Sequence, residues 1–499
     1  MRKLAAGSFA FLFLLAYVVS ASPAAAATTY LRPDKDRSTS GWNIVGAPTA
    51  SQALADPVTP SEIPSATSYV QTKCSFGCSL ETLSVDLDTA SLAGLTNVAV
   101  TAWFYTPDSS PVQMEARRAG VFVLGSVESK KAGWHSASVS LTKQAHLDDL
   151  SLHFKKGFSG STGPRIYSAF VQLTYTPPST SIYWGSWIDG DVYTKAGEEP
   201  WGDAPWSNQT WDEFEANSGG KPLSILHFGQ PAPWNQSFAE GPLDLTIERG
   251  AIPMMDMDPD GVTLSSINSG AKDADFQAWA AAVSEYGKPF FLRWSWEMNG
   301  QWFKPYGPES AASPELYKQV WRRIHGIATE HGAHNITWVW CPNVTVEGTT
   351  PISQLYPGDA YVDWTCMDGY NRGSNPINPE GSKSFSGVFS QTYQELLSIA
   401  PSKPIMIGEV GATEVDLFRK KRDWIAEALG SELPTNFPKI EAVLWFNWNH
   451  PEPTGERWDW QIESSPAAEA SFRNVISSPF YAANAFGSLP PLTKIQPLP

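Results

Sequence analysis

The sequence predicts an all-β sandwich over residues 28–177, followed by a (β/α)₈ TIM barrel over residues 178–484. In the first part, strand-like runs follow one another with only turn residues between them, which is typical of antiparallel sheets. In the second part, strand-like runs alternate with helical stretches, which is typical of a parallel barrel. Residues 177–180, with the sequence PPST, are expected to form a short, stiff linker between the two units.

The composition is that of a globular protein with a large core, since 42% of the 499 residues are hydrophobic and 17% are charged. The 35 basic and 51 acidic residues give a net charge of −16, which disfavours nucleic acids and anionic membranes as partners. A neutral substrate suits this charge better than an acidic one. We expect a monomer with no nucleic-acid or membrane partner.

The N-terminus predicts a signal peptide over residues 1–27. Arg2 and Lys3 give a positive start, residues 9–19 are apolar, and residues 24–27 offer a small-residue cleavage site. No later stretch reaches the roughly 18 uninterrupted apolar residues of a membrane helix. A secreted, extracellular protein that begins near Thr28 is therefore expected.

The prediction of an all-β first unit depends on four runs in which apolar and polar residues alternate, at residues 97–106, 119–127, 134–141 and 168–176. The eight strands expected for the barrel are residues 182–187, 223–228, 252–255, 290–296, 336–340, 362–367, 405–407 and 442–446. A doubly wound open sheet is the alternative, but no Gly-rich phosphate loop supports it.

Helix signals accompany these strands. Residues 274–287 and 313–332 are the clearest helices, and the second has Ser313 as its N-cap and Pro314 in its first turn. A last helix is expected to start at Ser465 and Pro466. The Pro-rich tail over residues 485–499 is expected to be extended over the surface or disordered.

The four cysteines suit an oxidising compartment. Cys74 and Cys78 are expected to clip a local loop. Cys341 and Cys366 lie at or near the ends of strand-like runs, so they either pair across adjacent strands or remain as two buried thiols.

Two glutamates occupy equivalent places in two strand-like runs. Glu297 follows the apolar run in KPFFLRWSWEMNG, and Glu409 follows the one in KPIMIGEVG. An ionisable side chain at the end of a buried strand is costly unless it has a partner or a task. Breaking a glycosidic bond requires two carboxyl groups, and in a barrel both must project from the carboxyl ends of strands.

The second unit resembles glycoside hydrolase family 26 through RWSWEMNGQW, ITWVWCPN, YPGDAYVDWTCMDGYN, KPIMIGEVG and LWFNWN, in the family's order and over about residues 181–480. The resemblance implies a retaining endo-hydrolase of a β-linked polysaccharide, with Glu297 as acid/base and Glu409 as nucleophile. It implies an endo-β-1,4-mannanase-like activity, with β-1,3-1,4-glucanase, β-1,3-xylanase or another bacterial polysaccharide hydrolase as alternatives. A catalytically inactive carbohydrate-binding protein is the alternative of another class. No cofactor and no metal are expected.

The resemblance also implies supporting residues. Tyr370 matches a tyrosine that supports the nucleophile, and Trp302 and Trp445 match aromatic residues that line the cleft. Arg293 is expected either to hold Glu409 or to form an ion pair that stabilises the barrel. Asn299 binds sugar hydroxyls or stabilises its own turn.

The electrostatics of the acid/base follow from its surroundings. An apolar shell of Trp294 and Trp296, together with the charge of Glu409, is expected to raise the pKa of Glu297 and keep it protonated. Trp296 stands where the family commonly has histidine, and tryptophan cannot accept a hydrogen bond. His227 either supplies a polar contact in its place or is a packed or exposed histidine.

The aspartates after the third barrel strand and the role of the N-terminal unit are less clearly indicated by the sequence. Asp256, Asp258 and Asp260 precede Gly261 as in the first half of an EF-hand loop, but the glutamate at the loop's last position is absent. A β-sandwich beside a hydrolase barrel is either a carbohydrate-binding module or a structural module, with Trp42, Phe104 and Tyr105 as candidate stacking residues.

Overall fold

The computed structural model describes residues 27–31, 33–38, 42–45, 47–54, 69–72, 82–87, 96–107, 109, 111–129, 131–140, 150–156, 165–176, 181–188, 208–374, 381–417, 420–451, 457–487 and 489–499. The predicted signal peptide, apart from Ala27, lies outside the described residues, as do Cys74, Cys78 and the predicted linker.

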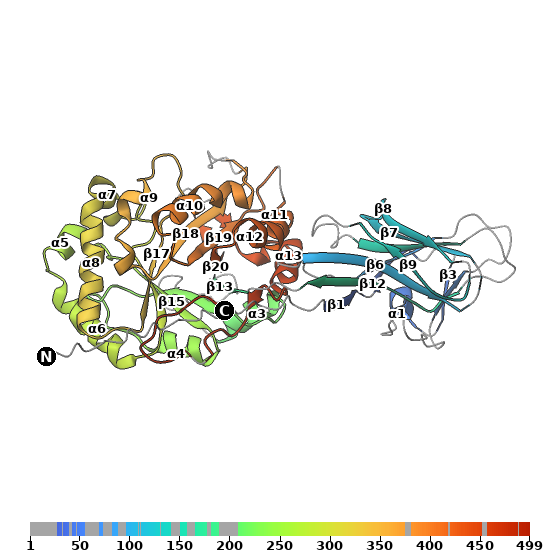
Figure 1. Cartoon of the computed structure of the whole chain (residues 1–499), viewed down its shortest axis with the longest axis horizontal. Helices are drawn as coiled ribbons and strands as arrows, with labels where there is room; N and C mark the ends of the chain where they lie inside the picture. The colour runs from blue at the N-terminus through green and yellow to red at the C-terminus, as the bar shows by residue number, and fades with distance from the viewer. Residues whose placement is uncertain are drawn as a thin grey trace, which may run out of the picture.

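The N-terminal region is rich in antiparallel strands (Figure 1). One sheet has the order β1 (Ala27–Leu31), β12 (Ser168–Thr176), β6 (Thr96–Thr106) and β9 (Gly133–Ser138). A second has the order β2 (Pro33–Ser38), β5 (Thr82–Leu87), β10 (Leu150–Lys156), β7 (Val112–Arg118) and β8 (Phe122–Glu128). A third joins β11 (Arg165–Ile166), β4 (Tyr69–Thr72) and β3 (Trp42–Val45), and α1 spans Ala50–Leu54. All four runs predicted as strands contain one.

Alternate residues of these strands form one hydrophobic core. Val100, Ala102 and Phe104 of β6 belong to it and are buried, whereas Tyr105 faces the other way and is partly exposed. The prediction of Phe104 as a stacking residue is therefore wrong, because its position in the alternation points it into the core. The side chain of Trp42 lies outside the described part of the chain.

The second unit is a closed barrel of eight parallel strands. Its strands are β13 (Ile182–Ile188), β14 (Ile225–Gly229), β15 (Ile252–Met257), β16 (Phe290–Trp294), β17 (Ile336–Trp340), β18 (Trp364–Asn371), β19 (Ile405–Ala412) and β20 (Ile440–Asn447). They pair in chain order, and β13 pairs with both β14 and β20, which closes the ring. The (β/α)₈ prediction is confirmed, and the open sheet is excluded.

Helices surround the barrel strands (Figure 1). The helices are α3 (Asn208–Asn217), α4 (Gly241–Glu248), α5 (Leu264–Asn268), α6 (Asp273–Tyr286), α7 (Tyr306–Ala312), α8 (Pro314–Glu330), α9 (Ile352–Leu355), α10 (Phe385–Ile399), α11 (Lys421–Glu427), α12 (Leu433–Asn436) and α13 (Pro466–Ile476). Short turns η2 (Asp359–Tyr361), η3 (Ala428–Glu432) and η4 (Ile462–Ser464), the hairpin β21 (Asn449–Pro451) and β22 (Arg457–Asp459), and β23 (Tyr481–Ala482) complete the unit. The predicted N-cap Ser313 is confirmed, since its side chain accepts a backbone hydrogen bond from Leu316. The last helix starts where it was predicted, and Ser465 caps it by accepting from the backbone of Ala468.

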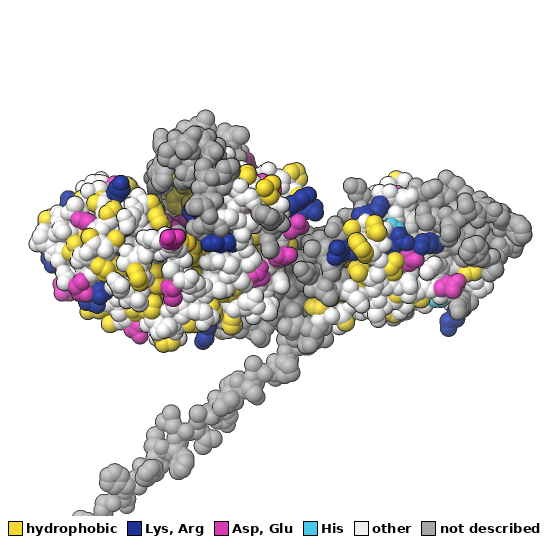
Figure 2. All heavy atoms as spheres, turned by 90° about the horizontal axis from the view of Figure 1, so that it is seen from above, with side chains coloured by type: hydrophobic (Ala, Val, Ile, Leu, Met, Phe, Trp, Pro, Cys, Tyr) yellow, Lys and Arg dark blue, Asp and Glu magenta, His cyan; other side chains and the backbone are white. Residues whose placement is uncertain are grey.

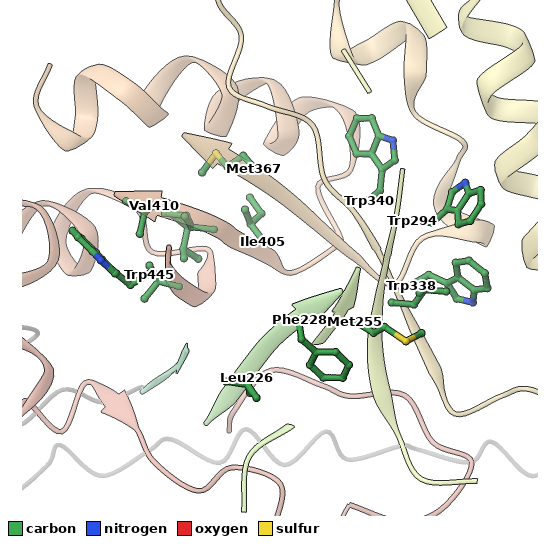
Figure 3. Packing of buried hydrophobic residues seen from close by; sticks show 14 of the residues in the cluster. Leu226, Phe228, Met255, Trp294, Trp338, Trp340, Met367, Ile405, Val410 and Trp445 are labelled. Atoms are coloured by element: carbon green, nitrogen blue, oxygen red, sulfur yellow. The ribbon is translucent and has the colours of Figure 1, made fainter. Parts of the chain in front are cut away.

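Barrel strands alternate between two hydrophobic layers. Leu292 and Trp294 of β16 join the cluster between strands and helices, whereas Phe291 joins the cluster inside the barrel. Figure 3 shows part of the outer cluster, in which Trp294 and Trp445 are labelled members. The polar side chains of a barrel site therefore have to come from the inward positions.

The tail closes the end of the barrel at which the strands begin. Ile495 is buried in the interior cluster, its backbone N–H donates to Thr337 Oγ1 at 2.8 Å, and its carbonyl accepts from Trp364 Nε1 at 2.9 Å. Of the two expectations for the tail, the structure favours the extended one: its described residues form no helix or strand and are exposed or partly exposed, except for Ile495, which anchors the tail. Within the described residues, the longest apolar helices still fall short of what crossing a bilayer requires.

Candidate active site

Glu297 lies in the turn that follows β16, at the carboxyl end of the barrel. Ser295 and Glu297 both have positive φ angles, 44° and 50°, which non-glycine residues adopt only when the surroundings hold them. One such restraint is a hydrogen bond of 2.7 Å from the backbone N–H of Glu297 to the carbonyl of Cys341, just beyond β17. The carboxyl group is buried, with the residue 7% exposed.

Glu409 reaches the barrel interior through a bulge in β19. Ile407 and Val410 both belong to the outer cluster, and the register with β20 shifts between them. The pair Gly408 and Glu409 therefore takes the place of one inward residue, which turns the Glu409 side chain toward the interior. There it accepts a hydrogen bond from Arg293, an inward residue of β16.

The two glutamates meet across a short gap. One carboxylate oxygen each from Glu297, Glu409 and Asp368 lies within 4.8 Å of the others. Carboxyl groups that activate a water between them stand about 6.5–9.5 Å apart, whereas those that share a covalent intermediate stand about 5–5.5 Å apart. The proximity of the nearest oxygens of Glu297 and Glu409 is compatible with the second class.

Glu297 carries the features of a proton donor. Asn343 Nδ2 donates to its Oε1 at 2.7 Å, and the indole N–H of Trp302 donates to its Oε2 at 2.5 Å. Burial, followed by repulsion from Glu409, raises the pKa of Glu297 to about 7, while these two hydrogen bonds oppose the rise. The expected rise is present, but Trp294 takes no part in it because its side chain lies in the outer layer.

Arg293 is the fully buried centre of a charge cluster. It donates to Asp256 Oδ1 at 2.7 Å and to Asp368 Oδ2 at 2.6 Å, and also to Glu409 Oε1. Burial disfavours its charge, but Asp256, Asp368 and Glu409 outweigh that effect and raise the pKa of Arg293 well above its usual value. Both roles expected for Arg293 are therefore combined in one side chain. It also supplies a positive charge to the neighbouring acidic groups.

Tyr370 holds the other oxygen of Glu409. Its hydroxyl donates to Glu409 Oε2, and burial, followed by the charge of Glu409, raises the pKa of Tyr370 well above its usual value. The ring stacks on Trp460 with centroids 4.2 Å apart. Both oxygens of Glu409 thus have donors, which fix the orientation of its carboxyl group.

Asn299 contacts the loop behind Glu297. Its Nδ2 donates to the carbonyl of Asn343 at 2.9 Å, and its Oδ1 accepts from the backbone N–H of Asn343 at 2.9 Å. Of the two roles considered for Asn299, the structure favours the one that stabilises the turn. Asn343 and Asp368 are site residues that sequence reasoning missed, although their places just beyond β17 and at an inward position of β18 are the signal for them.

Trp296 and His227 both lie beside Arg293. The guanidinium carbon of Arg293 is 5.1 Å from the ring centroid of Trp296, and Phe303 packs against the same ring at 5.0 Å. His227 Nε2 lies 2.6 Å from Asp256 Oδ2, and the residue is fully buried. Of the roles considered for His227, the structure favours a packed histidine.

The two tryptophans expected in the cleft have different surroundings. Trp302 is 48% exposed beside Glu297. Trp445 is 2% exposed, donates to the carbonyl of Trp460 at 2.9 Å and packs on Phe472. The expectation for Trp445 is wrong, because on β20 the inward residues are Ala442 and Leu444 and Trp445 points outward. A separate aromatic cluster packs with Tyr370 and contains Trp187, Phe446, Trp448, Trp458 and Trp460.

The three aspartates of β15 and its loop do not converge. Asp256 binds Arg293, Asp258 Oδ1 accepts from the backbone N–H of Asp260 at 2.8 Å, and Asp260 accepts from Asn235. Burial raises the pKa of Asp258. Within the described residues, this loop therefore does not assemble a calcium site.

Cys341 and Cys366 are bonded to each other inside the barrel, with their Cα atoms 4.2 Å apart. This resolves the two alternatives in favour of pairing across adjacent strands.

On the face seen in Figure 2, acidic and basic side chains are interspersed over the described barrel surface, as suits an uncharged ligand.

Comparisons with known proteins agree with the resemblance. Residues 215–402 match the model of Glycosyl hydrolase family 26. The chain is 35% identical over 266 residues to Endoglucanase H from Acetivibrio thermocellus, covering 52% of this chain and 28% of that protein. It is 29% identical over 202 residues to Mannan endo-1,4-beta-mannosidase from Bacillus subtilis, covering 39% of this chain and 48% of that protein.

This chain thus spans less than half the length of either relative. A solved structure, the catalytic domain of the GH26 endo-beta-1,4-mannanase from Bacillus sp. JAMB-750, is 20% identical, with a TM-score of 0.46, and covers 62% of this chain and 88% of that one.

Proposed function

Because the barrel of this chain belongs to glycosyl hydrolase family 26, matched over residues 215–402, we propose that the protein is a secreted retaining endo-glycoside hydrolase of a β-linked polysaccharide. The observation that carries the proposal is the pair Glu297 and Glu409, whose carboxylate oxygens lie within 4.8 Å at the carboxyl end of the barrel.

The first step of the reaction follows from the protonation of the two groups. The Glu409 carboxylate attacks the anomeric carbon, and the electron pair of the breaking bond moves to the glycosidic oxygen, which takes the proton of Glu297. Arg293 and Tyr370 orient Glu409 for this attack. The result is a covalent glycosyl ester on Glu409 and a released chain end.

The second step reverses the role of Glu297. Now a carboxylate, it takes a proton from a water whose oxygen attacks the same carbon, and Glu409 leaves with the bonding electron pair. The hydrogen bonds from Asn343 and Trp302 keep the carboxylate in place between the two steps. Two displacements leave the configuration at the anomeric carbon unchanged.

Two sugars are candidates for the substrate. The family resemblance favours β-1,4-mannan, and one relative bears a mannosidase name. A β-1,3-1,4-glucan is the second candidate, because the 35% identical relative is an endoglucanase and because Trp296 offers no hydrogen-bond acceptor for a sugar hydroxyl.

The direct test is release of reducing ends from β-mannan, β-1,3-1,4-glucan and β-1,3-xylan by the wild type, Glu297→Ala and Glu409→Ala proteins. We expect turnover of at least one polysaccharide by the wild type and loss of turnover in both variants. Binding of a polysaccharide without turnover by the wild type would instead support an inactive carbohydrate-binding protein.

The pH dependence of kcat/KM should report the ionisation of Glu297. Since the first step needs its proton, activity should fall as pH rises through about 7, the pKa to which burial and Glu409 raise it. Asn343→Leu removes a hydrogen bond that favours the carboxylate, so this fall should move to higher pH. A fall centred near pH 4.5, the ordinary range of glutamate, would contradict the assignment.

Substitution by phenylalanine should distinguish Trp302, which lies beside Glu297, from Trp445, which is buried between the barrel strands and the helices. Trp302→Phe removes a hydrogen bond to Glu297 and should lower kcat about tenfold with little change in melting temperature. Trp445→Phe should lower the free energy of unfolding by about 1–3 kcal/mol and leave kcat/KM nearly unchanged. Kinetics and thermal unfolding of both variants check this, and the reverse pattern would place Trp445 in the cleft.

We also propose that residues 28–177 form a β-sandwich module separate from the barrel at 178–484, and that it binds carbohydrate. Residues of its four- and five-stranded sheets share one core, and the partly exposed rings of Tyr105 and Trp134 pack edge to face with centroids 5.4 Å apart on the outer side. Weaker retention of Tyr105→Ala than of wild type on insoluble polysaccharide would support this, and equal retention would favour a structural module.

A further inference from the structure

The Cys341–Cys366 disulfide lies inside the barrel, beneath the two glutamates. Cys341 directly follows β17, and Cys366 lies on the adjacent β18. Both cysteines are buried in the interior cluster, together with Phe291 and Met406. The bond therefore joins two strands whose ends carry groups of the proposed active site.

On one side, the disulfide reaches the acid/base. The carbonyl of Cys341 accepts the backbone N–H of Glu297 at 2.7 Å. Glu297 lies in a turn with a φ angle of 50°, outside the ladder of β16, so this hydrogen bond is a main restraint on its backbone. A displacement of Cys341 would displace Glu297.

On the other side, the disulfide packs against the nucleophile's bulge. A Cβ atom on Gly408 would lie 2.6 Å from Cys366 Sγ and 3.1 Å from Cys341 Sγ. The backbone at Gly408, next to Glu409, therefore packs closely against both sulfur atoms of the disulfide. Asp368 Oδ1 lies 3.2 Å from Cys341 Sγ, and its other oxygen accepts from Arg293, which in turn holds Glu409.

We propose that this disulfide is a positioning element that sets the separation of the Glu297 and Glu409 carboxyl groups, in addition to cross-linking the chain. The inference rests on the proposed function for the roles of the two glutamates. Without the bond, the Cys341 carbonyl that accepts from Glu297 and the sulfur atoms that contact the Gly408 bulge are no longer fixed relative to each other, so both glutamates lose a common restraint.

The test compares three variants. Cys341→Ala/Cys366→Ala removes the bond, and Gly408→Ala keeps the bond but forces a methyl group against both sulfur atoms and against Asp368 Oδ1, which lies between the disulfide and Arg293. Ile252→Ala is the control, because it removes apolar volume from the same interior cluster at the start of β15, away from both glutamates. The readouts are kcat, KM, thermal unfolding and a ¹³C NMR titration of Glu297, assigned with Glu297→Gln.

We expect the double alanine variant and Gly408→Ala to lose about 10–100-fold in kcat with KM within about twofold, because small misplacements of reacting groups have effects of this size. As the carboxyl groups separate, Glu297 should titrate at lower pH than in the wild type. Ile252→Ala should melt at lower temperature but keep the wild-type kcat and titration.

A double variant that loses stability but matches Ile252→Ala in kcat and titration would show that the disulfide only cross-links. If the wild type turns over no polysaccharide, the proposed function fails first. The NMR titration still decides the inference in that case, because it requires no substrate.

Discussion

We expect Glu409→Ala to lower kcat by about 10⁴-fold or more on any polysaccharide that the wild type cleaves, because removal of a nucleophile removes the covalent pathway. The fold should survive the change. Glu409 is one of three buried acidic side chains that contact Arg293, so Asp256 and Asp368 still partner the arginine when Glu409 is removed. Stopped assays of reducing ends, with circular dichroism to verify folding, provide the measurement.

Azide rescue distinguishes the nucleophile from the acid/base among the two glutamates. In Glu409→Ala, the space left by the carboxyl group admits azide, which should attack the anomeric carbon and restore turnover with an inverted glycosyl azide as product. In Glu297→Ala, azide should intercept the intermediate on Glu409 and give the retained product instead. Rescue of neither variant, or the same anomer from both, would overturn the assignment of roles.

We expect Arg293→Met to have the largest effect on stability, about 3–5 kcal/mol, since it leaves buried carboxylates without their cation. Arg293 is fully buried and contacts Asp256, Asp368 and Glu409 at once. Arg293→Lys keeps the charge but cannot reproduce the forked contacts, so it should fall between the wild type and the methionine variant.

Arg323 offers a matched control. It pairs with Asp273 at the surface, where the arginine side chain is 34% exposed, so Arg323→Met should cost no more than about 1 kcal/mol. Urea unfolding of all three variants checks the order. Equal costs for the buried and the surface arginine would show that the charge cluster does not carry the stability we assign to it.

The sequence predicted the barrel because all eight strands have apolar runs of the right length and spacing. It also predicted Glu297 and Glu409, because each follows such a run. Tyr370 and Arg293 were expected as supporting residues of Glu409, although two roles remained open for Arg293. The helices α6, α8 and α13 were predicted, α8 from its N-cap Ser313 and the proline that follows it.

Other features depend on details that a pattern of residues does not contain. The inward orientation of Glu409 arises from a bulge, which local sequence does not reveal. Trp445 was misassigned by one position in the alternation of β20, and Ala442 and Leu444 would have shown the phase. The anchoring of the extended tail was not predicted, because its partners, such as Thr337, lie far away in the chain.

The stereochemistry of the first product tests the central claim most directly. ¹H NMR of the anomeric proton in the first minutes of hydrolysis, before mutarotation, reads the configuration that the enzyme leaves. The nearest oxygens of Glu297 and Glu409 lie within 4.8 Å of each other, which favours direct attack by Glu409 over attack by a water held between the two groups, so we expect the new reducing end to appear first as the β anomer. An α anomer that appears first would show that Glu409 is not a nucleophile and would contradict the mechanism.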